Sequence, residues 1–363
     1  GLAAVCAVAR ALPLYSRKGG DDGDRTVRVA LHAPEGPVDA AGLPRLQRIA
    51  DAVRGSAALS DTPAAELHTD AFVEQARKVG AGATSITVIA GSELDDKGYG
   101  ALWGVGKAAT RPPALVVLSW EPKGATSTVA LVGKGIVYDT GGLSIKGKDH
   151  MPGMKSDMGG AAAVLHAFGA AVDLGYPQRL HAVLCLAENA VGPDSFRPDD
   201  ILTLYSGKTV EVNNTDAEGR LVLGDGVAHA SKHLAPDVII DMATLTGAQL
   251  IATGRRHAGI VCNDEAWEAR CVAAGRASGD LVHPLPFVPE FFRKEFRSEV
   301  ADMKNSVKDR MNAQSSCAAQ FIAEHLVEFE GAWLHVDLAG PSGLDNGRGT
   351  GFGVALLAEL LGF

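Results

Sequence analysis

The sequence of 363 residues has no run of lysine or arginine that could form a basic stripe, and its formal net charge is −9. Nucleic-acid binding depends on concentrated positive charge that neutralises phosphates, so this absence argues against a nucleic-acid partner. The sequence also has no apolar stretch that reaches the roughly 20 residues needed to cross a bilayer. We therefore expect neither a nucleic-acid partner nor a membrane span.

Cysteine is scarce, and its five copies are widely scattered and form no C-x-x-C pair. An odd number in this arrangement argues against both a disulfide framework and a thiolate zinc knot. The N-terminal stretch has no basic segment, and Arg10 interrupts its apolar run, which argues against a secretory signal peptide. We predict a cytoplasmic protein, and the absence of an initiator methionine suggests a trimmed or incomplete N-terminus.

The motifs of nucleophilic and phosphate-binding enzymes are also missing. No G-x-S-x-G sequence occurs, and no serine or cysteine lies in a setting typical of a nucleophile. His229 and His233 have the i, i+4 spacing of a metalloprotease helix, but no glutamate follows the first histidine. Residues 205–209 end like a phosphate-binding loop, yet Leu202 stands where that motif requires glycine.

The sequence does contain a regular alternation of strand-like and helix-like stretches. Continuous apolar runs predict strands buried on both faces, and longer apolar repeats predict helices. Alternation of this kind specifies βαβ crossovers, so we predict an α/β fold with a central, mostly parallel sheet flanked by helices. Ligands of such sheets bind beyond the carboxyl ends of the strands. The clearest predicted strands are residues 85–91, 113–120, 126–133, 179–189, 237–245 and 332–340, and the clearest helices are 69–80, 158–175, 220–234, 315–326 and 351–361.

The first 50 residues contain little more than a helix-like piece, a polar loop, a strand expected at 26–33 and a connection rich in proline and glycine. This is too little for an independent domain. We therefore predict that residues 1–50 form a partial N-terminal α/β domain and linker, and that residues 51–363 form a catalytic domain.

A first group of charged residues lies in a glycine-rich loop expected at 134–157. It contains Lys134, Asp139, Lys146 and Asp157. A solvent-exposed loop could explain any one of them, and capping of the following helix could explain Asp157. Neither explains Asp139, or a lysine with apolar neighbours such as Lys134.

A second group lies in the sequence NNTDAEGR at 213–220. In an extended loop Asp216 and Glu218 point to the same side, and Arg220 continues that side just before a predicted helix. Capping of this helix is one interpretation of the two carboxylates. The other is that they share a site with the first group.

Four carboxylates brought together at neighbouring strand ends would repel one another unless cations lay between them. Oxygen ligands of this kind suit Mg²⁺, Mn²⁺ or Zn²⁺, and their number implies two metal ions. The second interpretation therefore predicts a two-metal site.

Four motifs carry a resemblance to a known family. The sequences GKGIVYDTGGLSIK, MKSDMGGAA, NTDAEGRL and DMATLTGA follow one another in the order typical of cytosolic leucine aminopeptidases. The chain resembles this family over roughly residues 59–363, and VYDTGGLSIKGK with MKNSV is most similar to its animal aminopeptidase-like branch. The resemblance implies an α/β catalytic domain preceded by a smaller α/β domain, most of which would be absent here.

The resemblance also implies roles for individual residues. Two divalent ions, Zn²⁺, Mn²⁺ or Mg²⁺, would be bridged by Asp139 and Glu218, with Lys134 and Asp157 serving one ion and Asp216 the other. A lysine can bind a metal only as the neutral amine. By the same resemblance Lys146 would polarise the scissile carbonyl and Arg220 would hold a bicarbonate ion as general base, while the first side chain of the substrate would enter a pocket near Met154, Thr244 and Gly247.

The predicted function is therefore that of a metal-dependent aminopeptidase acting on peptides, assembled as a homohexamer as the family is. One alternative is a non-catalytic peptide-binding oligomer of the same fold, against which the intact ligand positions argue. The other is a two-metal phosphoesterase, against which the lysine ligand and the absence of a phosphate-clamping basic cluster argue. Thr140 and the sequence SSCAAQF depart from the family pattern and put the substrate range in question.

Overall fold

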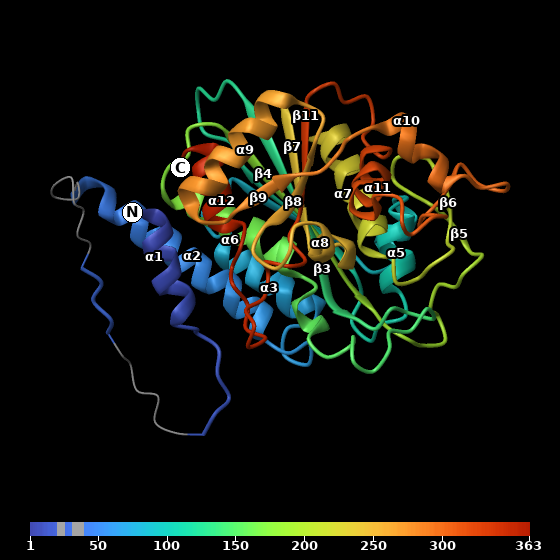
Figure 1. Cartoon of the computed structure of the whole chain (residues 1–363), viewed down its shortest axis with the longest axis horizontal. Helices are drawn as coiled ribbons and strands as arrows, with labels where there is room; N and C mark the ends of the chain where they lie inside the picture. The colour runs from blue at the N-terminus through green and yellow to red at the C-terminus, as the bar shows by residue number, and fades with distance from the viewer. Residues whose placement is uncertain (20–25, 31–39) are drawn as a thin grey trace.

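The computed structural model describes residues 1–19, 26–30 and 40–363, and its centre is an eight-stranded sheet. In sheet order the strands are β1 (Ser85–Ala90), β2 (Ala114–Trp120), β4 (Arg179–Asn189), β3 (Thr128–Asp139), β7 (Val238–Ala243), β11 (Ala332–Asp337), β8 (Ala258–Cys262) and β9 (Val282–Pro284). The four strands β4, β3, β7 and β11 are parallel, and β2 and β8 flank them in the antiparallel direction. The predicted α/β fold with a mostly parallel central sheet flanked by helices is confirmed (Figure 1).

Helices cover both faces of this sheet, as Figure 1 shows. The hydrophobic core on one face contains residues of α1 (Leu2–Ala11), α2 (Leu43–Asp61), α3 (Thr69–Val79), α6 (Gly159–Asp173), α9 (Glu265–Ser278) and α12 (Val354–Leu361), with α1 and α2 packed on other helices of this layer. The other packs against α5 (Gly100–Gly106), α7 (Gly219–His233) and α11 (Gln314–Ala323). The shorter helices are α4 (Ser92–Asp96), α8 (Gly247–Ala252), α10 (Pro289–Phe292), η1 (Ala40–Gly42), η2 (Met154–Ser156) and η3 (Arg293–Phe296). Within the described ranges no helix is both long and apolar enough to cross a membrane.

Burial on both faces explains why the central strands are apolar along their whole length. In β4, Leu184 packs into the core on the α6 face, whereas Val183 and Cys185 pack into the core on the α7 face. Successive side chains of a strand point to opposite faces, so a strand covered on both sides has no polar face. The continuous apolar runs predicted as buried strands are confirmed.

A second, three-stranded sheet lies beside the α5 and α7 end of the molecule (Figure 1). It consists of β5 (Ile201–Thr203), β6 (Thr209–Glu211) and β10 (Met303–Lys304). Strands of two or three residues are too short to give a periodic pattern, and the sequence did not predict them.

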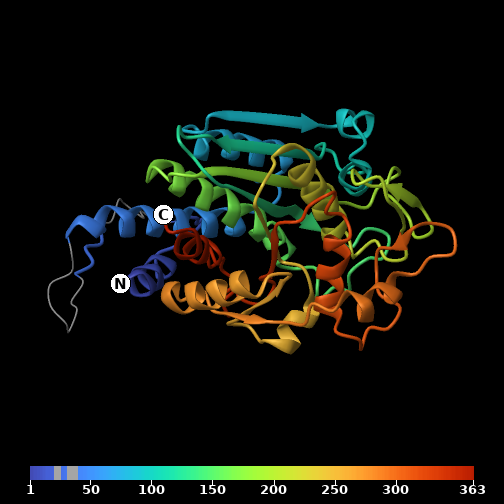
Figure 2. The same cartoon turned by 90° about the horizontal axis from the view of Figure 1, so that it is seen from above.

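The N-terminal segment packs onto the rest of the molecule. Helix α1 lies beside α2 and α12 (Figures 1 and 2), and the Arg10 guanidinium pairs with the buried Asp280 carboxylate at 2.5 Å. The predicted domain boundary at residues 50 and 51 falls inside α2, and the division into two domains stays a prediction. The strand predicted at 26–33 is wrong for residues 26–30, which have no regular structure, and residues 31–33 lie outside the described residues.

Candidate metal centre

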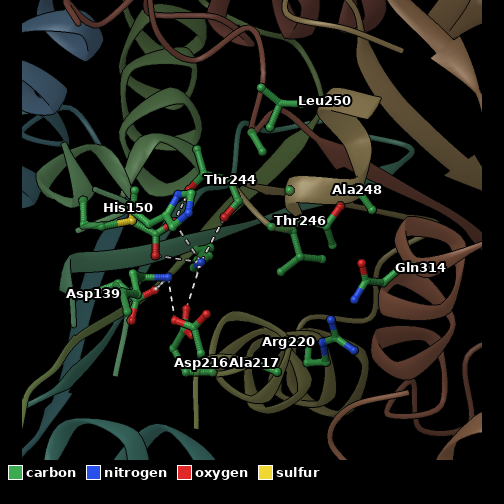
Figure 3. A pocket seen from close by; sticks show the side chains of 18 of the residues that line it. Asp139, His150, Asp216, Ala217, Arg220, Thr244, Thr246, Ala248, Leu250 and Gln314 are labelled. Carbon is green, nitrogen blue, oxygen red and sulfur yellow. Dashed lines mark hydrogen bonds and ion pairs between the residues drawn. The ribbon is translucent and has the colours of Figure 1, made fainter. Parts of the chain in front are cut away.

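A cavity of about 660 Å³ opens at the carboxyl ends of β3 and β7 (Figure 3). This is the edge of the sheet at which a parallel α/β fold binds ligands. Every site residue predicted from the sequence lines the cavity: Lys134, Asp139, Lys146, Met154, Asp157, Asp216, Glu218, Arg220, Thr244 and Gly247.

Lys134 lies within β3, which corrects the expectation of a charged loop starting at that residue. The pairing of β3 with β4 continues from Thr128 through Ile136 and, after a register shift, to Asp139. The apolar neighbours of Lys134 are therefore buried strand residues, and Lys134 itself is only 2 % exposed. Its side chain passes directly over Gly219, where an added Cβ would lie 2.6 Å from Lys134 Cε. Glycine at the start of α7 thus leaves the space that the lysine occupies.

The Lys134 ammonium group joins two of the predicted ligands. Its Nζ lies 2.8 Å from Asp157 Oδ2 and 3.0 Å from Glu218 Oε1, and it donates to the Thr244 carbonyl at 2.9 Å. The Thr244 hydroxyl also donates to Asp157 Oδ1 at 2.7 Å. These contacts connect β3, the turn before α6, the end of β7 and the start of α7.

Lys146 joins the remaining two carboxylates. Its Nζ lies 2.7 Å from Asp139 Oδ2 and 2.5 Å from Asp216 Oδ1. The other oxygen of Asp139 accepts from the Gly141 N–H at 2.9 Å and from Asn189 Nδ2 at 2.8 Å. Asp139 is thereby fixed at the end of β3.

Three of the carboxylates are close enough to share a cation. Single oxygens of Asp139, Asp216 and Glu218 all lie within 4.8 Å of one another. Asp157 stands outside this group, on the Lys134 side. The capping interpretation of Asp216 and Glu218 is not supported, because α7 has no side-chain cap at Glu218, and neither carboxylate has a backbone N–H of α7 among its described partners.

Burial and mutual repulsion change the protonation of this group. Burial raises the pKa of Glu218 to about 8, and the neighbouring Asp139 acts in the same direction. Burial also raises the pKa of Asp157 to about 6. Burial by itself would lower the pKa of Lys134, but the charges of Asp157 and Glu218 outweigh it and hold that pKa above its usual value. Positive charge between the carboxylates would therefore stabilise their ionised forms.

Arg220 is a buried cation that makes no ion pair with the residues the structure describes. It is 6 % exposed, and its Nε and Nη1 atoms have no hydrogen-bond partner among the described residues. Burial lowers its pKa to about 10. In Figure 3 it lies on the Gln314 side of the cavity, away from Asp139. Buried guanidinium groups are normally paired, so this position fits a small anionic ligand.

Comparison with known proteins agrees with this geometry. The profile of the cytosol aminopeptidase family, catalytic domain, matches residues 55–358. The chain belongs to this family. Its members are metal-dependent aminopeptidases, and the chain is an exopeptidase hydrolase of this class.

Individual members of the cytosol aminopeptidase family resemble the chain over almost its whole length. The human "Probable aminopeptidase NPEPL1" is 57% identical over 368 residues, which cover 99% of this chain and 70% of the relative. "Leucine aminopeptidase 1" of Caenorhabditis elegans is 49% identical over 364 residues, covering 99% and 74%. The solved structure of the Caenorhabditis elegans leucine aminopeptidase LAP1 has a TM-score of 0.96 at 48% identity and covers 99% of this chain and 74% of its own. The leucyl aminopeptidase of Trypanosoma brucei in complex with bestatin has a TM-score of 0.93 at 47% identity, with 99% and 71% covered.

The residues of the acidic group fit divalent cations. Glu218 Oε2 is buried and has no hydrogen-bond partner among the described residues, so this oxygen is available to bind a cation. The donor set is rich in carboxylate oxygens, which hard divalent cations prefer. Lys134, as a neutral amine, would add one nitrogen to it.

The sequence missed the residues that hold the acidic group in place. Asn189 ends β4, and its Nδ2 donates to Asp139 Oδ1 and to the Thr215 carbonyl. Thr215 in turn donates to the Gly141 carbonyl at 2.6 Å. A polar residue at the carboxyl end of a buried strand was the available signal for Asn189. No comparable signal marked Thr215 or the more distant Asn305, which supports the same loop.

Proposed function

We propose that this chain is a two-metal aminopeptidase that removes N-terminal residues, including leucine-like ones, from peptides. The observation that carries the proposal is the convergence of Lys134, Asp139, Asp157, Asp216 and Glu218, from three separate segments, on one cavity. Family membership supports the reaction class, and the finer assignments below are ours.

Two divalent ions, Zn²⁺, Mn²⁺ or Mg²⁺, would be held by these five side chains. We assign Asp139 and Glu218 to both ions, Lys134 and Asp157 to one, and Asp216 to the other. When bound, such ions supply Lewis-acid polarisation of a carbonyl and a water that ionises near neutral pH. Nearby cations would also favour the neutral form of Lys134 that ligation requires.

Lys146 would donate to the oxygen of the scissile carbonyl and stabilise the negative charge that develops there. The Lys146 side chain is 15 % exposed, so a substrate in the cavity can reach it. The Lys134 side chain is only 3 % exposed and is out of reach of a substrate. The two lysines therefore have different roles although both contact carboxylates.

Arg220 would bind a bicarbonate ion, and the bound ion would act as the general base. A guanidinium presents parallel N–H donors that match the planar oxygens of such an anion. Its unpartnered Nε and Nη1 atoms support this assignment.

The first side chain of the substrate would enter the part of the cavity near Met154, Thr244 and Gly247. Leu250 lines the same cavity, and a Cβ added at Gly247 would meet no described atom within 4 Å. Open space beside apolar atoms favours an uncharged side chain of moderate size.

We also propose a cytoplasmic location and a homohexameric assembly. The five cysteines, all in the described part of the chain, are free and buried, which is typical of a reducing compartment. Sedimentation of the purified chain would measure the assembly.

The proposed function is tested by hydrolysis of leucine anilide with added Mn²⁺, Zn²⁺ or EDTA. We expect cleavage that EDTA abolishes and that Asp216→Asn reduces by two or more orders of magnitude, since it removes a ligand charge. Asp345→Asn, on an exposed surface ion pair, is the control and should match the wild type. N-acetyl-leucine anilide should resist cleavage.

The same assay separates the alternatives. If the metal-replete wild type cleaved no unblocked amide, a non-catalytic peptide-binding protein would be favoured instead. If it cleaved only an added phosphate ester, a two-metal phosphoesterase would be favoured.

A further inference from the structure

One buried asparagine outside the cavity contacts the loop that carries two of the proposed ligands. Asn305 is 0 % exposed, and its Oδ1 accepts from the backbone N–H groups of Asn213 at 2.9 Å and Asn214 at 3.3 Å. Its Nδ2 donates to the carbonyls of Asn214 at 2.7 Å and Ala217 at 3.2 Å. A single side-chain amide thus makes four hydrogen bonds to one loop, residues 213–217.

The small sheet fixes Asn305 at this position. Strand β10 pairs in parallel with β6, with Met303 opposite Val210 and Lys304 opposite Glu211. The Asn305 N–H then donates to the Glu211 carbonyl at 3.1 Å, which brings its side chain level with the start of the loop. The pairing of β10 with β6 in the three-stranded sheet therefore determines where Asn305 lies relative to the loop at 213–217.

The loop makes only a few bonds of its own. The Asp216 N–H donates to Asn214 Oδ1 at 2.9 Å, and the Ala217 N–H donates to the Asn214 carbonyl at 3.2 Å. These bonds shape the turn around Asn214, but they do not attach it to the rest of the protein. Thr215 attaches the loop to Gly141, Ser144 and Asn189, and Asn213 exchanges two hydrogen bonds with Ser306. Asn305 adds four hydrogen bonds to backbone groups on both sides of the turn. Asp216 and Glu218 lie at the end of the segment so held.

Metal ligands must be held within roughly half an ångström of their productive positions. Groups that orient ligands without touching the metal commonly contribute about 10- to 100-fold to metal affinity. A loop with buried, unsatisfied N–H and carbonyl groups would rearrange to reach other partners. Removing the Asn305 amide would create such groups directly beside Asp216.

We infer that Asn305 is a positioning residue for the metal centre, which acts by clamping the backbone of residues 213–217 so that Asp216 and Glu218 face the cavity. This inference rests on the proposed two-metal function. It assigns to Asn305 no contact with substrate or metal. Its expected effect is on metal affinity and on the turnover that depends on it.

The test is calorimetric titration of Mn²⁺ into the full, chelator-stripped chain, for the wild type and Asn305→Ala. We expect Asn305→Ala to bind Mn²⁺ about 10- to 100-fold more weakly. In hydrogen exchange, the amides of Asn213 and Asn214 should exchange faster than in the wild type.

The control is Asn263→Ala, at an exposed asparagine. Asn263 also links two backbone segments, accepting from the Trp333 N–H at 2.7 Å and donating to the Gly331 carbonyl at 3.2 Å. It directly follows β8 and lies beside the start of β11, at the end of the parallel strands opposite the cavity. We expect this variant to lose stability but to keep the wild-type affinity for Mn²⁺.

A second variant covers the case in which Asn305→Ala does not fold. Asn305→Asp keeps the volume and the acceptor for Asn213 and Asn214, but an ionised carboxylate donates to neither carbonyl and a protonated one can donate to only one of them. We expect the same weaker Mn²⁺ binding. Wild-type affinity in a folded Asn305→Ala or Asn305→Asp protein would overturn the inference, whereas a wild type that binds no Mn²⁺ would overturn the proposed function itself.

Discussion

The position of Lys134 in the proposed metal centre depends on the absence of a side chain at Gly219. An added Cβ there would lie 2.6 to 2.8 Å from three atoms of Lys134, whose ammonium is fixed by Asp157, Glu218 and the Thr244 carbonyl. A lysine held at its tip cannot move aside without losing those contacts. The motif NTDAEGR thus contains a steric requirement as well as two of the proposed ligands.

We expect Gly219→Ala to weaken Mn²⁺ binding by about tenfold or more, because it displaces a ligand rather than a ligand's support. Titration of the chelator-stripped variant measures this effect. Gly224→Ala on the same helix is the control: its Cβ would meet Leu204 and His325, so it should cost about 1–3 kcal/mol of stability without changing the affinity. Equal affinities for Gly219→Ala and the wild type would show that Lys134 is not a ligand.

At the scale of secondary-structure elements, a carboxylate in helix α7 accepts hydrogen bonds from the first turn of helix α5. Asp225 in α7 is fully buried and accepts from the N–H groups of Ala101 and Leu102 at the start of α5 and from that of Tyr205. Burial raises its pKa from 3.8 to about 7, although the three N–H donors act in the opposite direction. The position of α5 against α7 is therefore linked to the protonation of one side chain.

This link predicts a pH dependence of stability. Between about pH 4 and pH 7 the unfolded chain has lost the Asp225 proton and the folded chain keeps it, so the contribution of Asp225 to folding stability falls as the pH rises. Urea unfolding of the wild type and Asp225→Asn should diverge, the wild type losing about 1 kcal/mol per pH unit relative to the variant over this range. Parallel pH profiles would refute the raised pKa.

Helix α1 gives a second prediction at this scale. Arg10 pairs with Asp280, whose other oxygen accepts from the N–H groups of Gly353 and Leu356 at the start of α12. Arg10→Met leaves the buried Asp280 without its cation, and we expect a loss of about 3 kcal/mol in urea unfolding. Arg17→Met, which removes an exposed pair with Glu66, should change little. A small effect of Arg10→Met would mean that α1 contributes little to the stability of the fold.

The elements that the sequence predicted best were those with long patterns. The strand at 179–189 and the helix at 158–175 were located almost to their ends, because burial on both faces left a continuous apolar run. The end of β3 was missed because Lys134, Tyr138 and Asp139 interrupt that run, although the backbone pairing continues. Helix α2 was missed because its small residues, such as Ala52 and Gly55, pack closely against α6 without a strong apolar pattern.

At the scale of the whole molecule, all ten predicted site residues line one cavity, because the parallel topology brings the ends of β3 and β7 to the same edge. The sequence could identify the charged residues, since charge among apolar strands stands out. It could not identify Asn305, whose role depends on the pairing of β10 with β6 across a separation of 93 residues. Contacts made by tertiary structure alone leave no local pattern.

The most direct test of the account is an anomalous difference map from crystals of the full chain grown with Mn²⁺ or Zn²⁺. We predict two peaks about 3.5–4 Å apart. One should lie at about 2.0–2.2 Å from atoms of Lys134 and Asp157 and the other at that distance from Asp216, with Asp139 and Glu218 reaching both. A map with no peak among these side chains, or with metal bound only elsewhere on the surface, would contradict the two-metal centre.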